Sequence, residues 1–289
     1  MINETNTNKS NHFKSYVKCI NEAELKRAMQ EGAIEIKDEK PYCKKCGKLL
    51  LSTHEIMTLF NRCETCDPVL LQRKAEAERQ AEAERQAEIK KAKEECFTGK
   101  RAFKQTFEND DQTNKEISEK LINNYIANFK EYQKDGIGLL LYGGTGTGKT
   151  FLARAVLHRL IENGYRAKEV KIIKAYNSVC SSGKEKEDFI TDLTYKHIVF
   201  IDDLGAERNN EAMSEFVYNI IDTLYEYKIP VICTTNLSFD KFKNADLDTN
   251  TGRTYSRILG ASIPLQINKA NKRVDDLKKV HKTWLDNTK

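Results

Sequence analysis

The sequence predicts an α/β fold, a parallel sheet flanked by helices, and three observations support that prediction. Apolar runs of strand length alternate with amphipathic helical stretches from residue 137 onward. A glycine-rich loop at 143–150 directly follows the first apolar run. Carboxylate residues directly follow one later run, and an amide residue ends another. Since ligands of open parallel sheets bind at the carboxyl ends of strands, these residues mark the expected site.

The expected elements follow one another in βα order. Buried strands are predicted at 137–142, 169–173, 197–201, 229–236 and 262–267. A helix is predicted at 150–163, and another at 211–227, where apolar residues recur at helical spacing: Phe216, Val217, Ile220, Ile221 and Leu224. The alternation favours parallel strands joined by helices on both faces of the sheet.

The glycine-rich loop reads G-x-x-x-x-G-K-T and predicts a nucleoside triphosphate site. Its glycines let backbone N–H groups approach phosphate oxygens, Lys149 can reach the β- and γ-phosphates, and the Thr150 hydroxyl can ligate Mg²⁺. The helix that follows would direct its positive N-terminus at the same phosphates. The residues expected to contact ATP or GTP include Gly143, Gly144, Thr145, Gly146, Thr147 and Gly148.

Polar residues at two strand ends complete the expected nucleotide chemistry. Asp202 follows four apolar residues, the Walker B position, where a carboxylate holds Mg²⁺. Asp203 is placed to orient or deprotonate the attacking water, and Asn236 ends another strand and could position the same water. For Asn236, a turn residue at a strand end is the alternative interpretation.

Four cysteines predict a structural zinc site. Two C-x-x-C pairs are separated by sixteen residues, a spacing typical of a tetrahedral four-thiolate centre: Cys43, Cys46, Cys63 and Cys66. Redox pairs or two disulfides are the competing interpretations, and no thioredoxin-like pattern surrounds either pair. Zinc would contribute folding energy to a module too short to be stable on its core alone.

A charged segment separates the cysteines from the nucleotide loop. Residues 70–96 contain neither glycine nor proline and carry a tandem Ala-Glu-Ala-Glu-Arg-Gln repeat. The six-residue period gives no sustained heptad seam, so a solvated helical spacer of about 40 Å is favoured over a coiled coil. The expected organisation is a zinc-binding module at 1–69, a helical linker at 70–97 and a nucleotide-binding domain at 98–289.

Composition limits the class of protein. The net charge of +5 and the 31% of charged residues indicate a soluble, mildly basic chain, compatible with a nucleic-acid partner without demonstrating one. The sequence has no apolar run long enough for a membrane span and no apolar core of a signal peptide near its beginning. We therefore expect a cytoplasmic protein with mostly reduced cysteines and no membrane partner.

At this point the motifs resemble a known family. The stretch 138–150, the run Asp-Asp-Leu-Gly-x-Glu at 202–207 and Thr-Thr-Asn at 234–236 are similar to AAA+ ATPases of the DnaC/DnaI helicase-loader and IstB group. Phe103, Phe107 and the segment 125–129 also precede the first strand as they do in loaders. The resemblance covers about residues 97–275 and implies an AAA+ P-loop fold with ATP and Mg²⁺ as cofactors and ATP hydrolysis as the activity.

The resemblance also implies roles for single residues. Asn236 corresponds to the sensor 1 position, and Arg257 is the chosen arginine finger, reaching the ATP of a neighbouring subunit, with Arg253 as the alternative. Such an arginine stabilises charge on the transferring phosphoryl group and implies self-association through the ATP site. Arg273 resembles the sensor 2 arginine. Asp203 stands where many AAA+ proteins have Glu, which does not exclude hydrolysis.

Three functions are compatible with these features. The first is a loader that binds a hexameric DnaB-type replicative helicase through a zinc module and delivers it to single-stranded DNA; both partners are implied by the resemblance. The second is an IstB-like ATPase helper of DNA transposition, which does not usually carry a four-cysteine module. The third is a zinc-based nucleic-acid adapter with a purely structural ATP site. A small-molecule kinase is disfavoured, since no acceptor pocket or arginine-rich lid is visible.

Overall fold

The structure is a computed structural model that describes residues 30, 34–38, 40–45, 47–49, 68–110, 114–182, 186–205 and 211–268. Its contacts divide the chain into two compact units, Met1–Gln86 and Ala87–Lys289.

The described part of the first unit contains a small hairpin. Strands β1 (Ile34–Lys37) and β2 (Lys40–Cys43) pair antiparallel, with Ile34 opposite Cys43. Both of these side chains are buried. After β2 the chain turns back on itself, because the Cys43 N–H donates to the Lys48 carbonyl at 2.9 Å and the Gly47 N–H donates to the Cys43 carbonyl at 2.8 Å. Gly47 has a φ of +74°, a left-handed conformation that glycine adopts without steric cost and that closes this tight turn.

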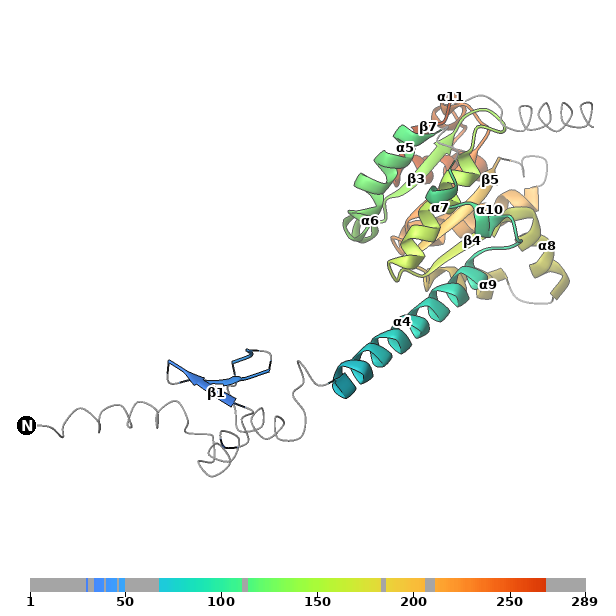
Figure 1. The fold of residues 1–289 in the computed structure, drawn as a ribbon. Helices are drawn as coiled ribbons and strands as arrows, with labels where there is room; N and C mark the ends of the chain where they lie inside the picture. Colours follow the sequence, from blue (N-terminus) through green and yellow to red (C-terminus); the bar gives the residue numbers. More distant parts are fainter. Residues whose placement is uncertain are drawn as a thin grey trace, which may run out of the picture. The chain divides into compact units, whose positions relative to one another are not determined.

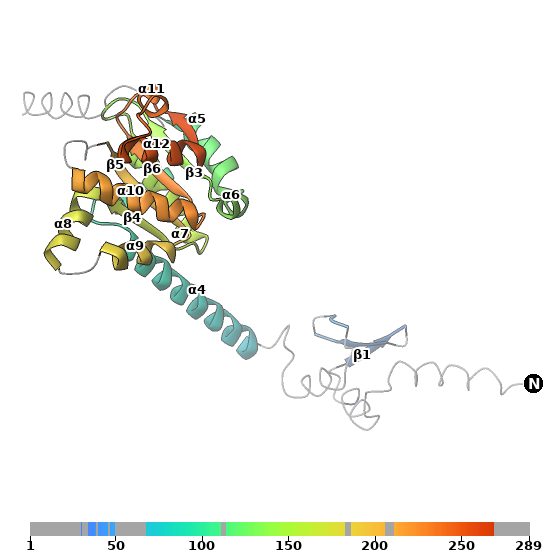
Figure 2. The ribbon, with the colours of Figure 1, turned by 180° about the vertical axis from the view of Figure 1, so that it is seen from behind.

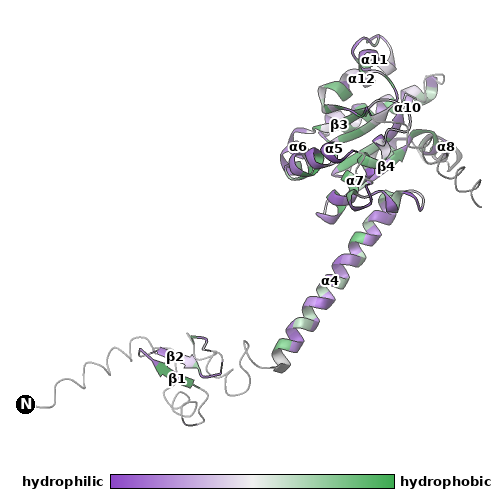
Figure 3. Ribbon diagram, turned by 45° about the horizontal axis from the view of Figure 1, so that its top comes forward, coloured by the Kyte–Doolittle hydropathy of each residue, from purple (hydrophilic) through white to green (hydrophobic). Residues whose placement is uncertain are grey.

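Helix α4 (Pro68–Cys96) has 29 residues and a length of about 44 Å. Proline suits the first turn of a helix, and no glycine or proline follows it inside α4. Side chains four residues apart bond along the exposed surface, as in Gln72 with Glu76 at 2.9 Å and Gln86 with Glu82 at 2.7 Å. Figure 3 shows α4 as largely hydrophilic. The helix expected at 70–96 is therefore present.

The second unit is built on a five-stranded parallel sheet (Figure 1). The strand order is β4-β5-β6-β3-β7. Pro264 lies in β7, an edge strand, where a residue without an N–H interrupts no further pairing. The strand bounds are β3 Gly138–Tyr142, β4 Ala167–Lys171, β5 Ile198–Leu204, β6 Val231–Thr235 and β7 Ser262–Gln266.

Helices cover both faces of the sheet, as the two opposite views show (Figures 1 and 2). Alternate residues of β3 lie on opposite faces of the sheet. Leu139 and Leu141 belong to one hydrophobic core, and Leu140 belongs to the other. The first core packs against α5 (Lys115–Lys120), the π-helix η3 (Leu121–Ile126), α6 (Phe129–Asp135) and α7 (Lys149–Glu162). The second packs against α8 (Ile172–Ser182), α9 (Lys186–Thr194), α10 (Glu211–Glu226), α11 (Phe239–Lys243) and α12 (Asn250–Gly260).

The α/β fold with helices on both faces is confirmed, and the strand bounds differ from those expected. Strand β5 extends to Leu204 and so includes Asp202 and Asp203. The strand expected at 169–173 lies at Ala167–Lys171, and Ile172 begins α8. Ile172 and Val179 are buried seven residues apart, which is helical spacing, while Ile173 is half exposed. Two adjacent isoleucines suggested a strand because β-branched residues favour one, but the surrounding helix decides their conformation.

Between α4 and α5 runs a segment that we call the strap, residues 97–110. It contains two short 3₁₀ helices, η1 (Ala102–Lys104) and η2 (Phe107–Asn109). Among the described residues, no helix combines the length and the apolar character that crossing a membrane needs.

Candidate nucleotide-binding site

The glycine-rich loop between β3 and α7 has a backbone that other residues would strain. Gly143, Gly146 and Gly148 have φ values of +143°, +79° and +101°. A Cβ on Gly143 would lie 2.4 Å from the Ile267 carbonyl oxygen, and one on Gly148 would lie 2.8 Å from Nδ2 of Asn114. These three glycines are therefore required by the fold of the loop itself.

Lys149 begins α7 and is buried. Its Nζ donates to the carbonyl oxygens of Gly143 at 3.0 Å and Gly144 at 2.6 Å, and to Oδ1 of Asn236 at 2.8 Å. These are as many acceptors as an ammonium group has protons. The structure thus holds the charge of Lys149 inside the loop, at the end of β6.

One carboxylate oxygen of Asp202 accepts hydrogen bonds from two hydroxyl groups. The hydroxyls of Thr150 and Thr234 each donate to its Oδ1 at 2.8 Å. Since β5 pairs with β6, and α7 begins at the loop after β3, three segments of the chain meet at this carboxylate. Hydroxyl and carboxylate oxygens are the hard ligands that Mg²⁺ prefers, so Thr150 and Asp202 fit that metal.

Asp203 lies beside Asp202 in a left-handed backbone conformation, with φ of +61°. The pairing of β5 with β6 shifts register between Ile201 and Leu204, and within this bulge the Asp203 N–H donates to the Thr234 hydroxyl at 2.9 Å. Its Oδ1 accepts from Nδ2 of Asn236 at 2.9 Å. A non-glycine residue held at positive φ is typical of functional sites.

These groups line a cavity of about 420 Å³ with two walls. The inner wall is formed by the glycine-rich loop and the ends of β5 and β6: Thr145, Gly146, Thr147, Gly148, Lys149, Thr150, Phe151, Asp202, Asp203, Thr234 and Asn236. The outer wall is formed by Arg101 and Gln105 of the strap and by Arg154 of α7.

The strap is held against α7 by side chains. Phe97 stacks on the His158 ring with 4.3 Å between centroids, and Nε2 of His158 lies 3.0 Å from the Ala102 carbonyl oxygen. Burial lowers the pKa of His158 below its ordinary value of 6.5, an effect that the Ala102 contact opposes. Arg159 pairs with Glu108, and the pKa of Glu108 is lowered chiefly by its own backbone N–H.

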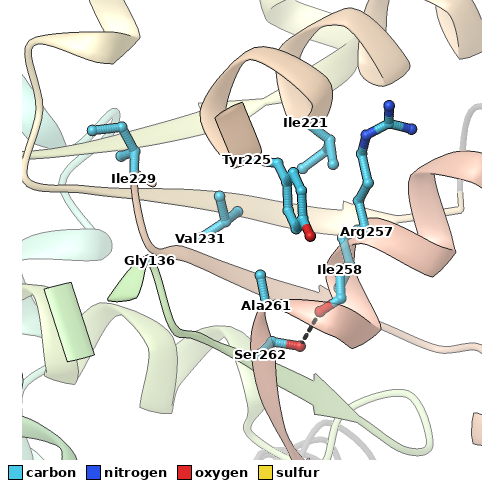
Figure 4. Close-up of a pocket in the computed structure, with 9 residues that line it drawn as sticks. All are labelled: Gly136, Ile221, Tyr225, Ile229, Val231, Arg257, Ile258, Ala261 and Ser262. Atoms are coloured by element: carbon cyan, nitrogen blue, oxygen red, sulfur yellow. Dashed lines mark hydrogen bonds between the residues drawn. The ribbon is translucent and has the colours of Figure 1, made fainter. Parts of the chain in front are cut away.

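The structure brings the loop, Asp202, Asp203 and Asn236 together, as their order along the chain suggests. Arg257 lies elsewhere, on α12, where it pairs with Asp222 and its guanidinium carbon lies 4.9 Å from the Tyr218 ring centroid. Figure 4 shows Arg257 beside a small apolar pocket that Tyr225 and Ile258 also line. The exposed Arg253 donates from Nε to the Leu247 carbonyl at 3.1 Å.

Several predicted residues lie outside the described residues. Of the four cysteines expected to bind zinc, Cys43 is described, and Cys46, Cys63 and Cys66 are not. Within the described ranges no cluster of three or more His, Cys, Asp or Glu side chains could hold a metal ion. Arg273 also falls on residues that the structure does not describe. The zinc site and the role of Arg273 remain predictions.

Sequence reasoning missed the outer wall and the role of Thr234. Arg154 interrupts an apolar helical stretch, and a charged residue on a buried helix needs a partner, so this position carried a signal. Arg101 and Gln105 carry none, because exposed polar residues are frequent in loops.

Comparisons with known proteins agree with this geometry. The family described as IstB-like ATP binding protein matches residues 69–278. The replicative helicase loader DnaI of Bacillus subtilis is 24% identical over 163 residues, covering 53% of this chain and 52% of that protein. A putative insertion sequence ATP-binding protein of Sinorhizobium fredii is 28% identical over 119 residues, covering 40% of each. The chain thus spans about half or less of the length of these relatives.

Among solved structures, the crystal structure of the DnaC helicase loader matches with a TM-score of 0.49 and 24% identity. That match covers 59% of this chain and all of the loader chain.

Proposed function

This chain belongs to the IstB-like ATP-binding family, in the AAA+ group of DnaC and IstB proteins, and from that membership we propose that it is an ATPase that loads a hexameric replicative helicase onto single-stranded DNA. The observation that carries the nucleotide part is the meeting of Lys149, Thr150 and Asp202 at one cavity. The loader part is supported by the similarity to DnaI along 163 residues.

The residues of the inner wall have distinct roles in the proposed reaction. Lys149 would exchange its carbonyl acceptors for β- and γ-phosphate oxygens, and Thr150 and Asp202 would hold Mg²⁺. The metal, when bound, neutralises charge that develops on the phosphate oxygens. Asp203 and Asn236, already bonded to each other at 2.9 Å, would orient the attacking water.

Substitution of Asp203 by Asn tests hydrolysis separately from binding. Asparagine tolerates a left-handed backbone and keeps the size of the side chain, so the variant should fold and bind ATP. Its turnover should fall by about 100-fold or more, since a positioned base contributes roughly 10²–10⁴. Phosphate release measured with saturating ATP checks this. Turnover equal to that of the wild type would remove Asp203 from the mechanism.

Arg257 lies away from the nucleotide cavity of its own chain, a position that suits a residue acting on the nucleotide of a neighbouring subunit. In the described chain it is paired with Asp222, so assembly would have to release it. We expect Arg257→Ala to lower the turnover of the assembled protein by about 1000-fold while leaving ATP affinity intact. Arg253→Ala is the matched control on the same helix, and a larger loss from Arg253→Ala would exchange the two roles.

The first unit is the proposed helicase-binding part, with zinc as its structural metal. The turn after β2 is compatible with a metal-binding knuckle, because Cys43 begins a C-x-x-C pair whose loop closes on Lys48. Zinc content of the full chain should be one equivalent, and the Cys43→Ser/Cys46→Ser variant should lose it while still binding ATP. Equal zinc content in both proteins would refute the metal site.

A transposition helper is the second candidate, favoured by the family description and by the insertion-sequence relative. Mass photometry of the full chain with the hexameric helicase of its host separates the two functions. A discrete complex whose amount depends on ATP, and which Lys149→Ala abolishes or alters, supports the loader. Absence of a complex in every nucleotide state contradicts it, and the transposase is then the partner to test.

A further inference from the structure

Arg154 is a buried cation on α7, five residues after Lys149, and it faces the nucleotide cavity from the outer wall. Its side chain is 7% exposed, and that of its main partner, Glu169 on β4, is fully buried. Nε and Nη2 of Arg154 both bond to Oε1 of Glu169, at 3.1 and 2.5 Å. A buried carboxylate needs such a partner to remain ionised, so this pair explains why a charged residue is tolerated here.

The same guanidinium reaches two further groups. Its Nη1 donates to Oε1 of Gln105 in the strap, and its Nη2 lies 3.8 Å from Oδ2 of Asp202. Since β4 and β5 are neighbouring strands, with Lys171 opposite Asp202, the cation lies between carboxylates of both strands. Arg154 thus connects the segment after α4 to the Asp202 carboxylate near the end of β5.

The two oxygens of Asp202 have separate partners. Oδ1 accepts the hydroxyls of Thr150 and Thr234, whereas Oδ2 faces Arg154. The two hydroxyl bonds on Oδ1 and the Arg154 charge 3.8 Å from Oδ2 favour the same orientation of this carboxylate. We propose that Arg154 is a positioning residue, which fixes the Asp202 carboxylate in the orientation that binds the divalent cation of the nucleotide. This inference rests on the proposed function of the cavity.

Two effects of Arg154 on the cation have opposite signs. Its positive charge near Asp202 repels a divalent cation and weakens binding. Its hold on the carboxylate strengthens binding, because residues that orient a metal ligand are worth about 10–100-fold in affinity. We expect orientation to dominate, since the Arg154 charge is already compensated by Glu169 at 2.5 Å. Removal of Arg154 should therefore weaken cation binding.

The test measures Mn²⁺, a paramagnetic divalent cation, binding to the full chain with a non-hydrolysable ATP analogue, from the electron paramagnetic resonance signal of free Mn²⁺. The main variant is Arg154→Met/Glu169→Gln, which removes both buried charges and leaves no unpaired carboxylate. Its Mn²⁺ affinity should be about tenfold lower. Its affinity for the analogue in excess EDTA should stay within about twofold, because the interaction acts through the cation.

Two further variants complete the design. Arg154→Lys keeps the charge but cannot reproduce the planar fork, and we expect an affinity about threefold lower, between wild type and double variant. This variant decides the outcome if circular dichroism shows the double variant to be unfolded. Arg159→Met is the matched control: it removes an arginine that also ties α7 to the strap, through Glu108, and its Mn²⁺ affinity should equal that of the wild type.

The outcomes separate this inference from the proposed function. Wild-type protein that takes up no Mn²⁺ with the analogue overturns both. Uptake by the wild type, with equal or tighter binding in the folded Arg154 variants, overturns the positioning role alone. An equal loss in Arg159→Met also overturns it, because the strap rather than Asp202 would then be responsible.

Discussion

The inner and outer walls of the nucleotide cavity are built by different kinds of interaction. The inner wall lies at the ends of strands whose backbones pair in the central sheet, and its side chains bond to one another at 2.8–2.9 Å. The outer wall depends on three side chains of α7, which contact the strap: Arg154, His158 and Arg159. Substitutions in the inner wall should therefore change nucleotide binding or hydrolysis, and substitutions at His158 and Arg159 should change the docking of the strap. Arg154 belongs to both effects, because it contacts the strap and Asp202.

The largest expected effect is at Lys149. Lys149→Ala removes the charge-assisted bonds to phosphate, and ATP should bind at least about 100-fold more weakly. Isothermal titration calorimetry measures this loss, with the exposed Lys130→Ala on α6 as the control for removal of one positive charge. Undiminished affinity in Lys149→Ala would remove the inner wall from nucleotide binding.

Phe97 tests the outer wall next. Phe97 is buried between His158 and Phe103, so Phe97→Ala should lower the free energy of unfolding by about 3 kcal/mol. Phe103→Ala, on the same strap but 38% exposed, should cost less than half as much. Chemical denaturation checks both values, and equal losses would show that burial of the strap contributes little.

Asp203 tests whether the inner wall stores backbone strain. Asp203→Gly and Asp203→Ala both lose the bond to Asn236, but only alanine keeps a Cβ at φ of +61°. We expect the glycine variant to be more stable by about 1 kcal/mol. At Asp188, an exposed residue of helix α9, the same pair of substitutions should give the opposite order, with alanine more stable by about 1 kcal/mol. The same order at both positions would exclude strain at Asp203.

The smallest expected effect is the pH dependence of the outer wall. Because burial lowers the pKa of His158, the unfolded chain takes up a proton more readily below pH 6.5, and stability is lost as the pH falls. The midpoint temperature of thermal unfolding should differ less between pH 7.5 and pH 5.5 in His158→Gln than in the wild type. His197, whose pKa is also lowered by burial, contributes a further loss in both proteins. An identical difference in the two proteins would contradict the role of His158.

The two walls also differ in how far the sequence predicts them. The strands and α7 follow from apolar runs, and the inner wall follows from local motifs because Lys149, Thr150 and Asp202 each stand at a fixed position relative to a strand. The contact of Gln105 with Arg154 joins residues 49 apart, and no local pattern encodes such a pair. The left-handed Asp203 is equally hidden, since its conformation arises from the bulge between β5 and β6.

Helix α7 carries Lys149 and Thr150 in its first turn and ends at Glu162, which accepts a hydrogen bond from Lys93 of α4 at 2.7 Å. Fourteen helical residues form a rod about 21 Å long that resists compression along its axis. A displacement of its first turn on phosphate binding would therefore also displace the last turns of α4, to which Glu162 is bonded. In the described part of the chain, α7 and the Lys93–Glu162 bond form a continuous rigid connection between the phosphate-binding loop and the last turns of α4.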